Sequence, residues 1–329
     1  MSEHAMIFAP APLLTVTVEQ RAGRPDIHLH AGGQGVWQAR MLTALGGRAV
    51  LVGGFGGESG AVLRRLLRKE GIQVCPVRGT VRNGVHIQDR RGGRRVTLVE
   101  AQAEPPSRHD LDELHNLALV QGIDAQVSVL SGPSPGDPEL APPDVYRRLA
   151  ADLTANGARV VADLTGSRLA AVAEGGAYLL KVSHEELGAE HLAPTGSVRE
   201  LAAVMRRLRT TSRQVVVVSR AEQPALALAG GELYEIVTGR MTPADPHGSG
   251  DSMTAGIVAG LLRDGDLKAA LRLGAAAGAI NATRHGLGTG GREAVERLAA
   301  LVDVRAIDAD LGHRVRLDRE ELAAWLTRD

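Results

Sequence analysis

The chain has 329 residues, a length that suits one large α/β domain with a small appendage. Its 38 basic and 38 acidic side chains balance, so no overall charge favours nucleic acid or an anionic membrane surface. Cys75 is the only cysteine, which excludes an internal disulfide framework and a multi-cysteine zinc or iron–sulfur site.

The N-terminus lacks a basic segment followed by a long apolar core. No uninterrupted apolar run reaches the roughly 18 residues that a membrane-spanning helix needs. We therefore expect a cytoplasmic protein with neither a membrane nor a nucleic acid as its partner.

Short β-rich runs alternate with amphipathic helical stretches over most of the chain. Strands are expected at 49–52, 126–130, 160–163 and 214–219, and helices at 61–70, 143–155 and 169–173. Such alternation predicts a mostly parallel central sheet with helices on both faces, a three-layer α/β/α fold.

Two regions break this alternation. Residues 14–30 and 85–99 show the two-residue periodicity of strands, and the second surrounds the turn Arg91-Gly92-Gly93. We expect two antiparallel hairpins outside the main sheet, which would form a small β-lid over one end of the body. After Ser252 the pattern becomes helical, with helices expected at 253–262, 267–283 and 292–301.

The most informative segment joins a glycine-rich turn to the start of a helix. Gly248, Ser249 and Gly250 precede Asp251 and the helical run from Ser252. Glycines let backbone N–H groups approach an anion closely, and a helix N-terminus adds the positive end of its dipole. Asp251 would lie beside this anion hole, where a carboxylate can take the proton of an alcohol that attacks a γ-phosphate. Taken alone, the same residues also fit an ordinary loop in which Asp caps a helix.

Other phosphate-binding motifs are missing or incomplete. No lysine follows a glycine, so a Walker A loop cannot form anywhere in the chain. The glycine cluster at 53–57 follows an expected strand but lacks the spacing of the dinucleotide fingerprint. We interpret this cluster as a tight connection between a strand and a helix.

Two signatures, in the right order, resemble those of the ribokinase-like, or phosphofructokinase-B, sugar kinases. The run Asp245-Pro246-His247-Gly248-Ser249-Gly250-Asp251-Ser252 resembles the family's Asp-Thr-x-Gly-Ala-Gly-Asp-Ser/Thr. The run Gly32-Gly33-Gln34-Gly35 resembles its N-terminal Gly-Gly-Lys-Gly. The resemblance covers residues 6–302 and is closest to the kinases of fructose 1-phosphate and tagatose 6-phosphate. It implies the ribokinase-like fold.

Further segments support this resemblance. The run Ser131-Gly132-Pro133-Ser134-Pro135 resembles the family's Ser-Gly-Ser-Leu-Pro turn. Residues 181–187 resemble Lys-Pro-Asn-x-x-Glu-Leu, and Arg82 falls where the phosphofructokinases have Thr-Arg-x-Asn.

The resemblance implies that ATP and Mg²⁺ bind along the C-terminal part of the chain. Gly248, Ser249 and Gly250 would hold the transferred phosphoryl group, Asp251 would deprotonate the acceptor hydroxyl, and Glu186 would organise Mg²⁺ through water. The other implied nucleotide-side residues are Lys181, Ser183, Ser219 and Asn281. For Lys181 and Asn281 the alternatives are a structural lysine at a strand end and a buried or capping asparagine. Residues 221–224 are Ala-Glu-Gln-Pro, where the family has Gly-Ala-x-Gly. Because this nucleotide loop departs from the family pattern, a phosphoryl donor other than ATP is an alternative.

The acceptor end departs more strongly from the family. The implied substrate-binding residues are Gly32, Gly33, Gln34, Trp37 and Arg82. However, Leu13 stands where the family has an Asp that binds sugar hydroxyls, Gln34 replaces a lysine, and Trp37 replaces an asparagine. A hydrogen bond to a charged group is worth about 1.5–3 kcal/mol, so the loss of two would weaken an ordinary sugar ligand well over tenfold. Trp37 could stack on a sugar or an aromatic acceptor, or it could fill the core.

We predict that residues 1–302 form the kinase domain, with lid strands at approximately 14–30 and 82–99, and that 303–329 form a C-terminal extension with a terminal helix. The predicted function is ATP-dependent phosphorylation of a sugar or sugar phosphate. The alternatives are a kinase for a nucleoside or heterocyclic alcohol and a nucleotide- or sugar-sensing protein without turnover. Relatives often dimerise through their lids, so a homodimer is expected by analogy only.

Overall fold

A ten-stranded sheet runs through the computed structural model, which describes residues 2–133, 140–239, 247–263, 265–284 and 287–308. Its strand order is β14-β13-β12-β11-β10-β9-β8-β1-β4-β5. The strands are β1 (Ser2–Phe8), β4 (Arg48–Gly56), β5 (Gln73–Arg82), β8 (Ala125–Ser131), β9 (Arg159–Asp163), β10 (Leu179–Ser183), β11 (Val215–Arg220), β12 (Gln223–Ala229), β13 (Glu232–Val237) and β14 (Asp303–Ile307). From β5 to β11 all neighbours pair in parallel, and the β12, β13 and β14 pairings are antiparallel, which confirms the predicted mostly parallel sheet.

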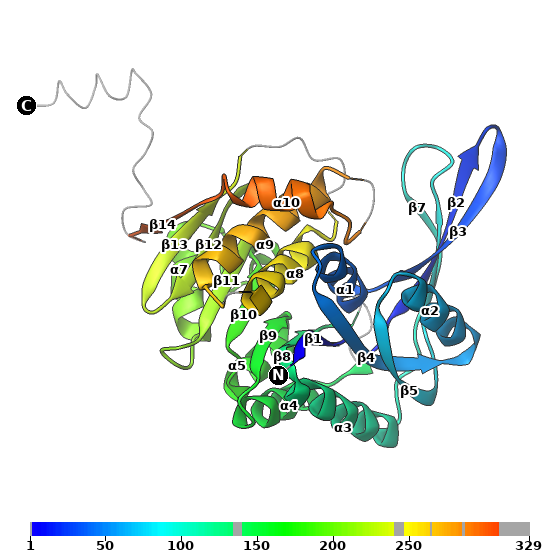
Figure 1. Cartoon of the computed structure of the whole chain (residues 1–329), viewed down its shortest axis with the longest axis horizontal. Helices are drawn as coiled ribbons and strands as arrows, with labels where there is room; N and C mark the ends of the chain where they lie inside the picture. Colours follow the sequence, from blue (N-terminus) through cyan, green and yellow to red (C-terminus); the bar gives the residue numbers. More distant parts are fainter. Residues whose placement is uncertain (1, 134–139, 240–246, 264, 285–286, 309–329) are drawn as a thin grey trace, which may run out of the picture.

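Helices cover both faces of this sheet (Figure 1). One face carries α1 (Gln34–Ala44), α2 (Gly57–Lys69), α8 (Ser249–Arg263), α9 (Leu267–Ala282) and α10 (Arg292–Ala299). The other carries α3 (Arg108–Asp124), α4 (Pro143–Ala155), α5 (Gly166–Gly175), α6 (His184–Ala189) and α7 (Val198–Leu208). Successive residues of a strand point to opposite faces, so β1 sends Ile7 into one core and Phe8 into the other. The two cores make the three-layer α/β/α fold.

Small residues let α8 and α9 approach each other closely. A side chain added at Gly256 would put its Cβ 2.7 Å from the Cα of Gly274. The alanine- and glycine-rich sequence of α9 therefore serves helix packing inside the body. In the described part of the chain, no helix is both long enough and apolar enough to cross a bilayer.

Four further strands form the lid, a separate sheet in the order β3-β2-β6-β7. They are β2 (Leu13–Arg21), β3 (Arg24–Gly32), β6 (Val85–Asp89) and β7 (Val96–Ala101). The β2–β3 and β6–β7 hairpins are antiparallel, as the alternating residues predict, and β2 joins β6 in parallel. Figure 1 shows β2, β3 and β7 projecting from the body beside α1 and α2.

Most expected helices and strands begin or end a few residues from the observed bounds, and two of these differences bear on the site and the body. Helix α8 begins at Ser249 rather than after Ser252, so Gly250 lies with Asp251 in its first turn. Residues 303–307 form β14, which pairs with β13 at the edge of the main sheet, so the body extends past residue 302. The rest of the predicted extension, with its terminal helix, lies outside the described residues.

The turn between β11 and β12 keeps a left-handed backbone without a glycine. Ala221 has a φ of 47°, in the region where an L side chain costs about 1–2 kcal/mol. We expect Ala221→Gly to raise the free energy of unfolding by about 0.5–1 kcal/mol, because glycine removes this strain at some cost in chain entropy. Urea denaturation followed by circular dichroism measures the change.

The same substitution at Ala300 is the matched control. Ala300 is exposed at the end of α10 with a φ of −66°, a conformation that alanine adopts freely. Ala300→Gly should therefore lower the free energy of unfolding, by up to about 1 kcal/mol. If both variants shifted it in the same direction, the strain assigned to Ala221 would be refuted.

Candidate active site

The candidate site lies at the carboxyl edge of the parallel strands. Ser131, Asp163 and Ser183 are the last residues of β8, β9 and β10, and Ser219 is the last but one of β11. Neighbouring parallel strands bring these ends to one edge of the sheet, where open α/β sheets bind their ligands. Helix α8 begins at this edge, so its N-terminus meets the strand ends.

Asp251 is buried in the first turn of α8, after a turn in which Gly248 has a φ of 72°. Burial, together with the negative charge of Asp163, raises the pKa of the Asp251 carboxyl to about 7. The Lys181 ammonium and a hydrogen bond from the Gln34 side chain act in the opposite direction. The carboxyl group is therefore poised to take up and release a proton near neutral pH.

Lys181 forms a buried ion pair beneath the glycine turn. Its Nζ lies 3.0 Å from Oδ1 of Asp163, and both side chains are almost fully enclosed. A Cβ added at Gly250 would lie only 2.6 Å from this Nζ, so the ammonium occupies the space next to the turn. Burial would lower the pKa of Lys181, but the charges of Asp163, Glu186 and Asp251 outweigh it and the pKa is raised. Lys181 therefore stays charged beside the predicted anion hole.

Asp163 is a central residue that the sequence analysis assigned to a strand without giving it a role. Its Oδ1 accepts from Lys181, and its Oδ2 accepts from Thr254 Oγ1 at 2.7 Å and from Gln38 Nε2 at 3.0 Å. A lone carboxylate at the end of an otherwise apolar expected strand, Val-Val-Ala-Asp, was the available signal. Its position at the carboxyl edge of a parallel strand would have pointed to the site.

The N-terminal glycine turn lies against the same centre. Gln34 Oε1 accepts a hydrogen bond from the backbone N–H of Gly132 at 2.7 Å, while its amide also bonds Asp251. Gly33 precedes α1 with a φ of 101°, so the turn needs a glycine there. Gly32 is buried at the end of β3, where an added Cβ would meet the Leu13 side chain at 3.1 Å. The structure therefore brings this turn to the candidate base, and acceptor binding by the turn stays a prediction.

Trp37 follows one turn later on α1 and is half-buried. Its backbone lies so close to Gly288 that a Cβ there would fall 2.5 Å from the Trp37 carbonyl oxygen. Part of the side chain stays accessible, so stacking on an acceptor remains a prediction for Trp37 beside the core-filling alternative. Leu13 is buried, and its side chain has no polar group to offer the site.

Ser183 and Glu186 form a capping box at the start of α6. The Ser183 hydroxyl accepts from the Glu186 backbone N–H at 3.1 Å, and a Glu186 carboxylate oxygen accepts from the Ser183 N–H at 2.7 Å. Glu186 also contributes its negative charge to the field at Lys181 and Asp251. The carboxylate is thus held in place near the centre by its own helix.

Asn281 supports the glycine turn from behind. It is fully buried, donates to the His247 carbonyl at 2.9 Å, and accepts from the Thr289 backbone N–H at 3.2 Å. These bonds fix the residue before Gly248. Asn281 is therefore a buried asparagine, one of the two alternatives that the sequence allows, and its contact with a nucleotide base stays a prediction.

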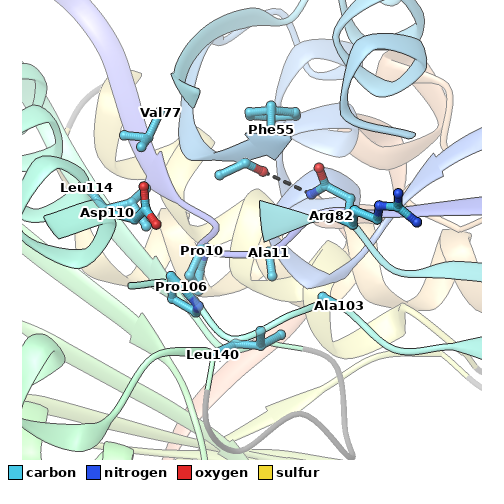
Figure 2. Close-up of a pocket in the computed structure, with 12 residues that line it drawn as sticks. Pro10, Ala11, Phe55, Val77, Arg82, Ala103, Pro106, Asp110, Leu114 and Leu140 are labelled. Atoms are coloured by element: carbon cyan, nitrogen blue, oxygen red, sulfur yellow. Dashed lines mark hydrogen bonds between the residues drawn. The ribbon is translucent and has the colours of Figure 1, made fainter. Parts of the chain in front are cut away.

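Arg82 ends β5 at the root of the lid and is exposed. Figure 2 shows its guanidinium pointing away from Val77 and Leu114, which line a small hollow there. The hollow measures about 20 Å³, room for about one water molecule. It is therefore too small to hold an acceptor, and the candidate centre is the edge around Asp251.

Asn83, next to Arg82, holds the root of the lid together and carried no sequence prediction. Its side-chain amide donates to the carbonyls of Pro12 and Gly54, at 2.8 and 2.9 Å, and its oxygen accepts from Gly56 N–H at 3.1 Å. Asn83 thus joins the start of β2, the end of β4 and the strand leading into β6.

The chain is similar to known carbohydrate kinases. A family model described as "pfkB family carbohydrate kinase" matches residues 14–294. The chain is 28% identical to 1-phosphofructokinase of Bacillus subtilis, over 84% of this chain and 88% of the relative. It is 30% identical to ATP-dependent 6-phosphofructokinase isozyme 2 of Mycobacterium tuberculosis, over 87% of this chain and 83% of the relative.

Solved structures show the same fold. Phosphofructokinase-2 from Escherichia coli in complex with fructose-6-phosphate superposes with a TM-score of 0.74 at 22% identity, over 91% of this chain and 98% of the other. Ribokinase from Thermotoga maritima superposes with a TM-score of 0.67 at 17% identity, over 90% and 99% of the two chains. At these identities the likeness shows the ribokinase-like fold.

The environment of Asp251 predicts how it titrates. In protein labelled with ¹³C at aspartate carboxyls, the Asp251 resonance should titrate near pH 7, whereas the partly exposed Asp89, which bonds Arg91, should titrate near pH 2. Gln34→Leu removes a hydrogen bond that favours the ionised carboxylate, so the Asp251 midpoint should rise in that variant. A midpoint that stayed put or fell in Gln34→Leu would refute the assigned contact.

Proposed function

Because the chain belongs to the pfkB family of carbohydrate kinases, we propose that it transfers the γ-phosphoryl group of ATP to a hydroxyl of a sugar or sugar phosphate, with Asp251 as general base. The observation that carries this proposal is the buried Asp251 in the first turn of α8, beside Lys181 and the glycine turn. Phosphoryl transfer needs little covalent chemistry from the protein, but it needs anion binding, charge stabilisation and a positioned base.

The donor end of the site supplies anion binding and charge stabilisation. The backbone at Gly248, Ser249 and Gly250 leads into the positive end of the α8 dipole, which favours a phosphoryl group there. The Lys181 ammonium lies next to Gly250 and adds a full positive charge. Ser183 and Ser219, on the neighbouring strand ends, belong to the proposed nucleotide side.

Asp251 then takes the proton of the acceptor hydroxyl as its oxygen attacks the γ-phosphorus. Its raised pKa of about 7 makes the carboxylate a stronger base than an ordinary aspartate, and the group is partly ionised at neutral pH and largely ionised at mildly basic pH. Lys181 and Gln34 offset part of the effect of burial, since both favour the ionised form.

The charges around the site fit a Mg²⁺ ion. Asp163, Asp251 and Glu186 bring three carboxylates to the surroundings of one ammonium, Lys181. Within the described ranges no three such ligands are close enough to hold a metal directly, so contact through water suits the site. We propose that Glu186, held by its capping box, is one of these water-mediated contacts. When bound with ATP, Mg²⁺ would neutralise phosphate charge.

The acceptor stays the open part of the proposal. The relatives are named phosphofructokinases, and we propose a sugar phosphate as the acceptor of this chain as well. The residues that we propose on the acceptor side are Gly32, Gly33, Gln34, Trp37 and Arg82. The buried Leu13 and the half-buried Trp37 favour a second candidate, a nucleoside or heterocyclic alcohol, because an aromatic ring can stack on its base. A cytoplasmic location, where ATP is available, stays a prediction.

We also propose that two copies associate through the lid. Cross-strand register places Ile27, Val18, Asp89 and Val96 in one row of the lid sheet and Leu29, Val16, Ile87 and Val99 in the next. All of these side chains are apolar except Asp89, which pairs with Arg91. The outer members are exposed by 60% for Ile27, 54% for Val96, 45% for Leu29 and 50% for Val99. An apolar sheet face of this kind is covered in most soluble proteins. A second copy offers the same apolar rows, which makes the contact self-complementary.

The reaction is tested by screening the purified protein with MgATP against sugars, sugar phosphates and nucleosides. We expect Asp251→Asn to lower kcat on the accepted substrate by roughly 10²- to 10⁴-fold, since the proton acceptor is lost. Asp152→Asn is the matched control, because Asp152 pairs with His115 between α3 and α4, away from the site.

The outcomes separate the alternatives. Turnover retained in Asp251→Asn would refute Asp251 as the base. A wild type that binds nucleotide but phosphorylates no member of the panel would favour the sensing protein. Phosphorylation of nucleosides in preference to hexose phosphates would select the second candidate.

The lid contact is tested by sedimentation velocity. We expect the wild type to sediment as a dimer and Leu29→Glu to shift it toward monomer, because a charge would be buried at the contact. Leu301→Glu is the control, since Leu301 is 77% exposed at the end of α10. A wild-type monomer, or equal sedimentation of the two variants, would contradict the proposed contact.

A further inference from the structure

Gln38 is a buried polar residue of α1 whose side chain reaches the centre of the site. It is only 1% exposed, and it lies one helical turn after Gln34. Its Nε2 donates to Asp163 Oδ2 at 3.0 Å, and its Oε1 accepts from the Ser131 hydroxyl. This one side chain therefore links α1, β8 and β9.

The Asp163 carboxylate determines which way the Gln38 amide points. A carboxylate only accepts hydrogen bonds, so the N–H₂ end must face Asp163, and the Ser131 hydroxyl then donates to Gln38 Oε1. Helix α1 can come this close because residue 35 is glycine: a Cβ there would lie 2.5 Å from the Ala9 Cβ and 3.3 Å from Ser131 Oγ. The donor to Asp163 is thus positioned by the packing of α1 on the sheet.

Asp163 in turn determines where Lys181 lies. Its Oδ2 is held by Gln38 and Thr254, so its Oδ1 is presented to the Lys181 ammonium at 3.0 Å. The single Thr254 hydroxyl proton is shared between Asp163, at 2.7 Å, and the more distant Gly250 carbonyl oxygen, at 3.2 Å, so the carboxylate is connected to the glycine turn. A buried carboxylate that loses a donor is destabilised and reorients toward its remaining partners.

We propose that Gln38 is a positioning residue, which through Asp163 holds the Lys181 ammonium beside Gly250 to receive the donor's phosphates. The inference rests on the proposed function only in taking the phosphates of ATP as the ligand of Lys181. Gln38 itself contacts neither the nucleotide nor the acceptor. Its contribution is to keep the Asp163 carboxylate turned toward Lys181.

ATP binding by the full-length protein, measured by titration calorimetry with MgATP, tests this without an acceptor. We expect Gln38→Met, which keeps the size of the side chain but removes both hydrogen bonds, to weaken ATP binding by roughly tenfold. Gln214→Met is the matched control: Gln214 is 0% exposed and bonds Thr210 and the Ala177 carbonyl, at the opposite end of β11 from the site. It should lose stability but keep the ATP affinity of the wild type.

Two further variants separate positioning from general damage. Ser131→Ala removes the hydrogen bond to Gln38 Oε1 but leaves the Asp163 side chain unchanged. We expect this variant to bind ATP several-fold more weakly. It therefore tests the inference even where Gln38→Met folds poorly. In the double variant of Gln38→Met and Lys181→Met, the first change should add nothing to the second, because Gln38 acts through Lys181.

Each result is decisive. The inference is overturned if Gln38→Met and Ser131→Ala both keep the ATP affinity of the wild type. It is also overturned if Gln214→Met loses as much affinity as Gln38→Met, or if the effects of Gln38→Met and Lys181→Met are fully additive. A wild type that binds ATP but phosphorylates no acceptor overturns the proposed function and leaves this inference standing. A wild type that binds no ATP overturns both.

Discussion

The buried ion pair between Asp163 and Lys181 is the interaction on which the rest of the site depends. Taking two charges out of water is costly, and their attraction compensates only when further hydrogen bonds satisfy them. Asp163 obtains those bonds from Gln38 on α1 and Thr254 on α8. The two helices that carry the acceptor turn and the candidate base are therefore tied to one carboxylate. The same pair sets the field at Asp251, where Asp163 and Lys181 act in opposite directions.

The two ends of the proposed site depend on different groups. The proposed donor end uses backbone N–H groups, a helix N-terminus and one lysine, which follow from the fold and from a few glycines. Even the turn at Ala221 keeps the left-handed conformation without its glycine. The acceptor end depends on individual side chains, and Leu13, Gln34 and Trp37 all differ from the family pattern. Membership of the family therefore identifies the reaction with more force than it identifies the acceptor.

Gln34 shows how one replacement can link the two ends. Its amide bonds both the backbone of Gly132 and the candidate base, so a neutral side chain now contributes where the family has a cation. A neutral donor lowers the pKa of Asp251 through a hydrogen bond alone. The base in this chain is consequently governed by burial, by Asp163 and by Lys181, and burial has the largest effect.

Residues near one another in the sequence determined much of this protein. Strand–helix alternation predicted the parallel sheet, two-residue periodicity predicted the lid hairpins, and the run from Gly248 to Asp251 indicated the chemistry, because each is a local pattern. Only the tertiary structure showed that Gln38, Asp163 and Thr254 meet, since they are 125 and 91 positions apart along the chain. It also placed β14 in the sheet, because a short edge strand is recognised by its pairing with β13 rather than by its own residues. Local sequence determines elements and turns, whereas the partners of a buried polar group are determined by packing.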